Sequence, residues 1–456
     1  MFPPSVRRCE SVRRRRVPCG LHPLCSKDEA SRRRTVRPPS AESGTFVAPE
    51  PHDALIYDWN QDEPALAPRR IALLDETLRD GLQNPSVVEP SIEAKVRLLH
   101  LMNDLGIDGA DLGLPGSSER EFLDVVRLCE EIARSKLRVR PACAGRTVAR
   151  DIAAILDVAG RTGAAVEAFV FTGSSLIRQL VEGWDLRLVL KRSAVAIEMA
   201  VRGGLEVSFV TEDTTRSRPE VVRSLFRMAI DCGATRVCIA DTAGHATPDG
   251  VRNIVAFTCE VVRETGAGVG IDWHGHNDRG LALENALCAL EAGADRVHGT
   301  ALGVGERVGN APMELILLNL KLLGLLGERD LTSLLDYCAE AARALDWSVP
   351  INYPLIGRDA FRTATGVHAA AIAKAEARGD AWLADRVYSG VPAGLFGREQ
   401  EICIGPRSGA SNVRHWLARR GIGATPVLVA AILAVAKCAD RVLGDEDLMA
   451  IVRAAG

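Results

Sequence analysis

Apolar and polar residues alternate in a repeating strand-then-helix pattern between residues 71 and 330. Short apolar runs predict strands, and each is followed by a longer stretch with the period of a helix that buries one face. We expect eight strands at residues 71–75, 107–112, 137–142, 165–171, 205–210, 236–240, 269–273 and 296–300. We expect the following helices at residues 91–105, 118–133, 148–159, 185–202, 219–232, 248–264, 281–292 and 312–323.

Eight strand-helix units in about 255 residues have the size of a closed (β/α)8 barrel. A doubly wound open sheet is the alternative, but no predicted strand is followed directly by the GxGxxG turn of a dinucleotide site. The pattern therefore predicts an α/β fold with a (β/α)8 TIM barrel over residues 71–330.

The chain on either side of the barrel has a different character. Residues 331–456 read as mostly helical linker subdomains, with helices at 339–344, 366–377, 411–420, 426–436 and 446–455 and extended pieces at 388–392 and 401–404. Residues 1–40 hold ten Arg, one Lys, three acids and six Pro, a net charge of +8. Such a segment cannot bury enough apolar surface to offset its ordering entropy.

We therefore expect an Arg/Pro-rich disordered tail over residues 1–70, with order beginning near Ile71. A start codon assigned too far upstream, a transit peptide and a nucleic-acid-binding arm are the alternatives. Glu10, Asp28 and Glu29 oppose the transit peptide, because such peptides are poor in acids.

Composition and charge argue against several classes of function. Hydrophobic residues make up 47% of the chain, enough for a large core, and aromatic residues only 4%. The net charge of −3 becomes −3 − 8 = −11 once residues 1–40 are set aside, which opposes nucleic acid as a partner. No apolar run is long enough to span a membrane. Twelve Cys without a CxxC pair favour free thiols and a cytoplasmic location.

Polar residues cluster just after five of the predicted strands, where the ends of barrel strands converge on one mouth. These polar runs occupy residues 75–84, 211–216, 241–245, 274–278 and 303–310.

His274 and His276 are two apart on a predicted strand, so their side chains point to the same side. With Asp80 across the barrel they form a three-ligand divalent-metal site with open positions, and Asn310 lies at another strand end. The alternative is a pair of hydrogen-bonded histidines without a metal.

Arg79 and Glu212 each allow a second interpretation. Arg79 is either a surface ion pair of Asp80 or a fixed guanidinium that stabilises a developing oxyanion. Glu212 is either a helix N-cap acid or part of the site. The glycines of residues 303–309 allow close backbone approach, and their amides could cradle anionic groups.

Residues 75–83, 274–278 and 303–310 together resemble the metal-dependent TIM-barrel acyltransferases and lyases of the isopropylmalate synthase type. That family includes 2-isopropylmalate, homocitrate and citramalate synthases and, more distantly, 3-hydroxy-3-methylglutaryl-CoA lyase. The resemblance spans about residues 71–420. It implies a Claisen-type condensation of acetyl-CoA with a 2-oxo acid, giving a 2-alkylmalate and CoA, and a divalent metal ion (Mn, Mg, Zn or Co) as cofactor.

The resemblance also assigns roles to residues. It gives the metal ligands as Asp80, His274, His276 and Asn310. Arg79 matches the arginine that stabilises the ketone oxygen as it becomes an alkoxide, Gln83 and Thr242 match positions that touch the 2-oxo acid, and Glu212 matches an acid near the reacting centre.

Beyond the barrel, His368 and Tyr388 resemble a catalytic pair that the neighbouring subunit supplies in the family. This implies a homodimer with shared active sites. The alternative for His368 is an ordinary polar residue at a helix N-terminus.

The sequence is least specific about which 2-oxo acid is the acceptor substrate. Leu114, after the second strand, predicts an apolar pocket that favours 2-oxoisovalerate, the precursor in leucine biosynthesis, or pyruvate over 2-oxoglutarate. Arg146 could still supply a cation for a second carboxylate, so homocitrate and citramalate synthase remain alternatives.

Two further alternatives remain. Leu82 is closer to the lyase branch than the usual acid, but a lyase predicts a Cys within residues 303–310, and there is none. A catalytically inactive barrel that serves as a binding partner is the alternative from a different class.

Overall fold

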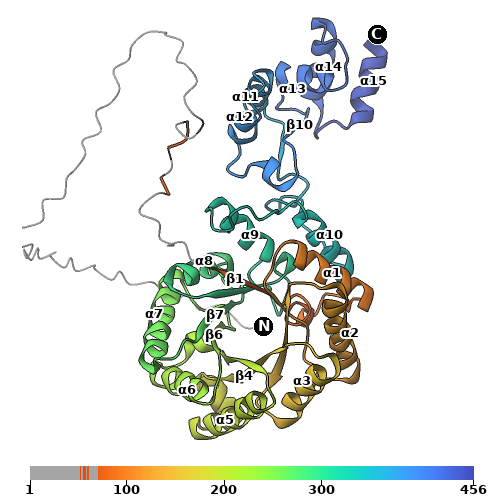
Figure 1. Cartoon of the computed structure of the whole chain (residues 1–456). Coiled ribbons are helices and arrows are strands. Elements are labelled where there is room, and N and C mark those ends of the chain that lie inside the picture. Colours follow the sequence, from red (N-terminus) through yellow and green to blue (C-terminus); the bar gives the residue numbers. More distant parts are fainter. Residues whose placement is uncertain (1–51, 53–54, 58, 61–69, 456) are drawn as a thin grey trace, which may run out of the picture. The chain divides into compact units, whose positions relative to one another are not determined.

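The computed structural model describes residues 52, 55–57, 59–60 and 70–455 (Figure 1). The tail predicted over residues 1–70 lies outside the described residues, apart from these few positions. Within the described part of the chain, no helix combines the length and the apolar composition needed to cross a membrane.

Eight parallel strands form a closed barrel in the order of the sequence, and β1 pairs with β8 to complete it. The predicted TIM-barrel fold is therefore confirmed. The strands are β1 Ala72–Asp75, β2 Gly109–Asp111, β3 Arg140–Arg146, β4 Glu167–Gly173, β5 Glu206–Glu212, β6 Arg236–Asp241, β7 Gly270–Gly275 and β8 Arg296–Gly299.

The helices surround the strands, as Figure 1 shows. They are α1 Ile92–Asp104, α2 Glu119–Ser135, α3 Ala149–Thr162, α4 Leu176–Glu182, α5 Leu186–Arg202, α6 Pro219–Asp231, α7 Pro248–Thr265, α8 Ala282–Ala292 and α9 Met313–Leu322. The sequence pattern missed α4, a short helix after β4. The Ser175 hydroxyl caps it by accepting a hydrogen bond from the Arg178 backbone N–H, and Gly183 ends it in a left-handed conformation.

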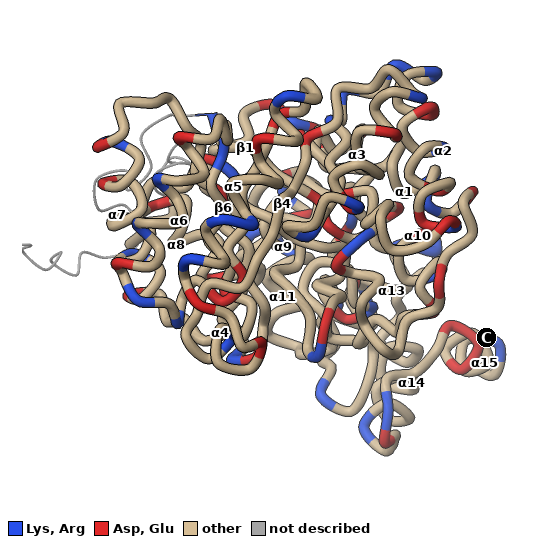
Figure 2. The backbone as a smooth tube through the Cα atoms, turned by 90° about the horizontal axis from the view of Figure 1, so that it is seen from below, with Lys and Arg blue, Asp and Glu red and all other residues tan. Residues whose placement is uncertain are grey.

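Opposite charges pair between neighbouring outer helices. Arg223 of α6 contacts Glu264 of α7, and Arg97 of α1 donates to Glu340 at 2.8 Å. Figure 2 shows basic and acidic residues interspersed along the helices and strands.

Two layers of side chains fill the inside of the barrel. A small apolar layer contains Leu74, Ala142 and Phe169. A second, charged layer is built on Arg296, whose guanidinium contacts the carboxylates of Glu167 and Asp272. All six residues are less than 9% exposed. The interior is therefore a packed core and not a pore, and in barrels of this kind the functional site lies at the C-terminal ends of the strands.

Helix α10, Leu334–Leu345, packs against α1 and is tied to the barrel by a buried contact. The hydroxyl of Tyr337 donates to the carboxylate of Asp75 at the end of β1. Burial raises the pKa of Asp75 to about 6.

The chain beyond α10 forms a mostly helical region, as expected. Its elements are β9 Arg362–Thr363, α11 Gly366–Ala377, α12 Ala381–Arg386, β10 Glu401–Ile402, α13 Ala410–Ala418, α14 Pro426–Cys438 and α15 Asp445–Ala455. The two short strands pair in parallel. The prediction of an extended segment at residues 388–392 is wrong, because these residues form turns and bends. Within them the Ser389 hydroxyl donates a hydrogen bond to the Val391 carbonyl. Helix α12, begun by the cap Asp380, was not expected.

Candidate metal centre and active site

A cavity of about 390 Å³ opens at the C-terminal mouth of the barrel. Seven of the predicted site residues line it: Arg79, Asp80, Gln83, Glu212, Thr242, His274 and His276. Asn310 is buried beside it and contacts Asp80. The convergence of strand ends, which the sequence pattern predicted, is what brings these residues together.

Asp80, His274 and His276 form a buried group whose possible ligand atoms lie within 4.8 Å of one another. The Nε2 atoms of both histidines are 3.6 Å from Oδ2 of Asp80. The Nδ2 of Asn310 donates to the same Oδ2 at 2.8 Å, while its own Oδ1 is buried without a hydrogen-bond partner. Two imidazoles, a carboxylate and an unpartnered amide oxygen are a donor set that suits a divalent cation.

The charge states of this group also suit a cation. Burial and the neighbouring His274 lower the pKa of His276 to about 4, so its imidazole is neutral at pH 7. Burial alone would raise the pKa of Asp80, but Arg79 and the two histidines lower it below its usual value. A neutral imidazole and an ionised carboxylate are the forms that bind metal.

Gly305 allows Asn310 to sit close to the chain. A Cβ at position 305 would lie 2.5 Å from Nδ2 of Asn310, closer than a side chain can approach. The glycine loop thus makes room for Asn310, as its composition indicated.

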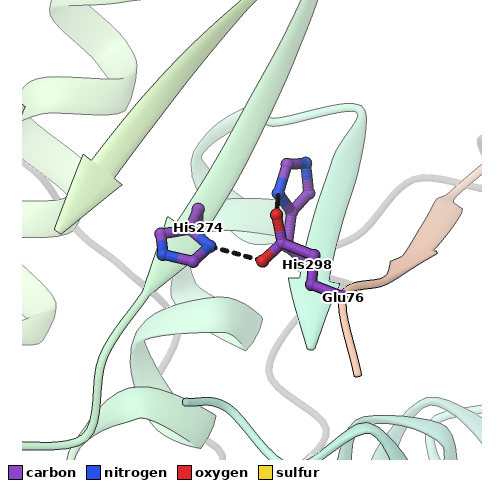
Figure 3. Close-up of side chains that lie close together, drawn as sticks. All are labelled: Glu76, His274 and His298. Atoms are coloured by element: carbon purple, nitrogen blue, oxygen red, sulfur yellow. Dashed lines mark hydrogen bonds and ion pairs between the residues drawn. The ribbon is translucent and has the colours of Figure 1, made fainter. Parts of the chain in front are cut away.

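Glu76 is a site residue that the sequence analysis missed. Its Oε2 lies 2.6 Å from Nδ1 of His274 and its Oε1 lies 3.1 Å from Nδ1 of His298. Figure 3 shows the carboxylate between the two imidazoles. Because Nδ1 of His274 is engaged by Glu76, Nε2 is left to face Asp80. Glu76 lies in the polar run of residues 75–84, but its position in the sequence does not distinguish it from the other polar residues of that run.

Arg79 is held by three carboxylates. Its Nε donates to Asp111 at 2.7 Å, its Nη2 to Glu76 at 3.1 Å, and its Nη1 lies 3.3 Å from Asp80. The side chain is only 19% exposed, so this is not a surface ion pair. Asp111, at the end of β2, was also missed. Burial raises its pKa to about 6, although Arg79 opposes the rise.

Glu212 and Thr242 also line the cavity. The Glu212 carboxylate at the end of β5 is 3.8 Å from Nη2 of Arg178, a residue of α4 that the sequence analysis missed. Burial raises the pKa of Glu212. The Thr242 hydroxyl accepts a hydrogen bond from the Asp213 backbone N–H at 2.9 Å.

Besides Asn310, three predicted site residues do not line the cavity. Leu114 is half-buried after β2, and its backbone N–H donates to Glu121. His368 of α11 and Tyr388, which follows α12, stack on each other with ring centroids 3.9 Å apart. Tyr388 is 49% exposed, so part of this aromatic pair is accessible to solvent.

Comparisons with known proteins identify relatives of this chain. A family model described as HMGL-like matches residues 70–339. A probable 2-isopropylmalate synthase of Methanopyrus kandleri is 32% identical over 361 residues, which cover 78% of this chain and 67% of that protein. A homocitrate synthase of the same organism is 32% identical over 80% of this chain and 87% of its own length. A putative (R)-citramalate synthase of Archaeoglobus fulgidus is 32% identical, with coverages of 80% and 70%.

Solved structures share the barrel. The 3-hydroxy-3-methylglutaryl-CoA lyase of Bacillus subtilis superposes with a TM-score of 0.52 at 21% identity, covering 62% of this chain and 96% of that one. At this identity the likeness shows the fold alone.

Proposed function

The chain belongs to the HMGL-like family, in the acyltransferase group of the 2-isopropylmalate and homocitrate synthases, and from this premise we propose that it condenses acetyl-CoA with an aliphatic 2-oxo acid, 2-oxoisovalerate before others. The products are then 2-isopropylmalate and CoA, as in leucine biosynthesis. The observation that carries the proposal is the buried group of Asp80, His274 and His276 beside the Arg79 guanidinium.

Asp80, His274, His276 and the amide oxygen of Asn310 are the residues that would hold a divalent cation. Such a cation supplies a Lewis acid and a template for the ketone and carboxylate oxygens of the 2-oxo acid. Glu76 orients His274 for this role through the hydrogen bond to Nδ1.

Arg79 supplies a fixed positive charge for the ketone oxygen of the substrate, which gains negative charge as the new carbon–carbon bond forms. Three carboxylates hold its guanidinium, so it does not need to reorganise when that charge develops. In the reaction the acetyl methyl group loses a proton to a base, and its carbon bonds to the ketone carbon. The ketone oxygen then takes up a proton, and water hydrolyses the thioester to release the CoA thiol.

The base is assigned to the stacked pair His368 and Tyr388 of a second copy of the chain. This assignment is supported by the resemblance of their sequence segment to that of the acyltransferases and by their absence from the cavity lining of their own chain. Glu212 lines the same cavity and its raised pKa favours a held proton, which supports assigning it a proton exchange with the reacting oxygens.

The lining of the cavity favours an aliphatic acceptor. Ala144, Phe169, Phe171, Val210 and Ala240 form its apolar part. The arginines of the lining other than Arg79 are also paired with carboxylates of the chain: Arg178 with Glu182, Arg216 with Asp213 and Arg307 with Asp278. A second substrate carboxylate, as in 2-oxoglutarate, would have to displace one of these partners.

The test measures CoA thiol release from acetyl-CoA with Mn²⁺ or Mg²⁺ and a panel of 2-oxoisovalerate, pyruvate, 2-oxobutyrate and 2-oxoglutarate. We expect the largest kcat/KM for 2-oxoisovalerate, with 2-isopropylmalate identified by mass spectrometry. His276→Ala should abolish release. A preference for 2-oxoglutarate would overturn the acceptor, and cleavage of 3-hydroxy-3-methylglutaryl-CoA without any condensation would overturn the reaction.

Leu114→Ala and Val210→Ala separate two views of the acceptor pocket. Val210 lines the cavity and Leu114 does not. If the cavity at the mouth of the barrel holds the acceptor side chain, Val210→Ala changes the ratio of kcat/KM for 2-oxoisovalerate over pyruvate more than Leu114→Ala does. The reverse result would support the pocket that the sequence alone suggested.

A further inference from the structure

A buried series of polar groups continues from the metal group down the axis of the barrel. It runs from His274 to Glu76, His298 and Asp272, and the successive contacts are 2.6, 3.1 and 3.3 Å long, all within hydrogen-bonding length. We propose that His298 is a positioning residue for the metal: it holds Glu76 in the orientation in which Glu76 fixes His274. This inference rests on the metal site of the proposed function.

The ring of His298 is fixed on three sides. Its Nδ1 is 3.1 Å from Oε1 of Glu76 and its Nε2 is 3.3 Å from Oδ2 of Asp272. Phe169 stacks on the ring, with centroids 5.7 Å apart and planes at 14°. The residue is only 2% exposed. Because an ionised carboxylate only accepts hydrogen bonds, both contacts are hydrogen bonds when each ring nitrogen carries a hydrogen, as in the imidazolium form.

Asp272 is itself anchored. The Nε atoms of Arg296 and Arg236 donate to its two carboxylate oxygens at 2.9 and 2.7 Å. Glu167 binds Arg296 at 2.7 and 2.8 Å. At the Asp272 end of the series, the carboxylates and guanidinium groups are therefore fixed by their ion pairs. His298 connects Glu76 to this fixed charged layer.

Glu76 needs this support because its two oxygens have different partners. Oε2 accepts from His274, whereas Oε1 is shared by Nδ1 of His298 and Nη2 of Arg79. Without His298, only Arg79 holds Oε1, and the carboxylate can turn towards the guanidinium and away from His274. Loss of the outer-shell carboxylate of a ligating histidine costs about 10- to 100-fold in metal affinity, and a Glu76 turned away from His274 is equivalent to that loss.

Glu76, His274 and His298 could instead bind a cation themselves, since their ligand atoms also lie within 4.8 Å. The distances oppose this. Nδ1 of His274 is 2.6 Å from Glu76, a hydrogen-bond length, and both nitrogens of His298 face carboxylates. The number of cations bound per chain distinguishes the two arrangements.

The experiment compares two amide substitutions at one buried position. His298→Asn places an amide nitrogen near the position of Nδ1 and can still donate to Glu76. His298→Gln places its amide nitrogen near the position of Nε2 and can donate only to Asp272. Mn²⁺ binding to the full chain is measured by titration calorimetry, without substrate. His100→Asn is the matched control, because His100 also pairs with a buried carboxylate, that of Glu131, outside the site.

We expect one Mn²⁺ per wild-type chain, affinity within about threefold for His298→Asn and His100→Asn, and a 10- to 100-fold loss for His298→Gln. Equal affinity of both His298 variants, or an equal loss in both, would overturn the positioning role. Two Mn²⁺ per chain that fall to one in both variants would do the same and would support the second cation site. A wild-type chain that binds no Mn²⁺ would overturn the metal of the proposed function and this inference with it.

Circular dichroism reports whether each variant folds. If a His298 variant does not, Glu76→Gln gives the second comparison. Its amide keeps a single accepting oxygen, so His274 or His298 loses its acceptor, and Mn²⁺ affinity is expected to fall by a similar factor. Unchanged affinity in Glu76→Gln would overturn the inference.

Discussion

The side-chain amide of Asn310 donates a hydrogen bond to Oδ2 of Asp80 across 2.8 Å, and so joins residues 230 positions apart. Asp80 follows β1 and Asn310 follows β8, the two strands whose pairing closes the barrel. The same Oδ2 faces Nε2 of His274 and of His276. Closure of the barrel is therefore the step that assembles the candidate metal centre.

Replacement of Asp80 by Asn should remove metal binding and condensation together. The amide retains the size of the side chain but loses the charge that a divalent cation requires, while Arg79 and Asn310 remain beside it. We expect Mn²⁺ affinity to fall by about 100-fold or more, beyond the effect of an outer-shell partner. Calorimetry with Mn²⁺ and the thiol-release assay measure the two losses. Asp249→Asn, at an exposed residue of α7, is the control. Full activity of the Asp80 variant would contradict the metal site.

Arg79→Lys should lower kcat while the fold is kept. A lysine has the charge of arginine, but its single ammonium group cannot reproduce the fork that contacts Asp111, Glu76 and Asp80 at once. Loss of a preorganised oxyanion donor costs about 10²- to 10³-fold in kcat. Steady-state kinetics give the value, and Arg97→Lys on the outer face of α1 should leave kcat unchanged. A change confined to KM would mean that Arg79 binds the substrate and the transition state equally, and so does not lower the barrier of the bound substrate.

Glu314 should make stability fall as the pH rises. Burial raises the pKa of this carboxyl to about 7, and it accepts hydrogen bonds from the Tyr353 hydroxyl at 2.5 Å and the Leu302 backbone N–H at 2.9 Å. Between its ordinary pKa near 4.5 and about 7, the folded chain holds a proton that the unfolded chain releases. The free energy of unfolding therefore decreases with pH in that window, by about 3 kcal/mol in total.

Glu314→Gln tests this linkage, because its amide can satisfy both partners without titrating. Relative to wild type, the variant should gain stability from pH 5 to pH 8, as read from urea midpoints at each pH. Glu260→Gln, at a half-exposed site of α7, should follow the wild-type curve. Parallel curves for wild type and Glu314→Gln would show that Glu314 is ionised throughout.

Mixed dimers should reveal whether the site is shared. His274→Ala and His368→Ala are each expected to be inactive in the thiol-release assay. If His368 acts on the cavity of a second copy, co-expression of the two variants should restore about a quarter of wild-type activity, because half of randomly paired dimers contain one intact site of two. No recovery, with heterodimers verified by mass spectrometry, would contradict shared sites. The matched control is His100→Ala mixed with wild type, which should keep full activity.

Much of this protein could be predicted from local patterns. The alternation of strand and helix periods gave all eight strands and the closed barrel, because burial on a strand and on a helix follows the fixed periods of 2 and 3.6 residues. The same period placed His274 and His276 on one side, and the position of Asp80 directly after the first strand placed it at the same mouth. Where a segment is short and lacks a period, as in α4, α12 and residues 388–392, the pattern failed.

The partners of the site residues were decided by the tertiary structure. Glu76 and His298 are 222 positions apart, and Arg79 and Asp111 are 32 apart. No spacing rule relates them, because they meet only through the register of the strands: the backbone N–H of Glu76 donates to the Gly299 carbonyl next to His298. Sequence periods record which face of an element is buried. Which side chains from different elements share that interior depends on how far each strand is shifted along its neighbour, and only the closed barrel determines that shift.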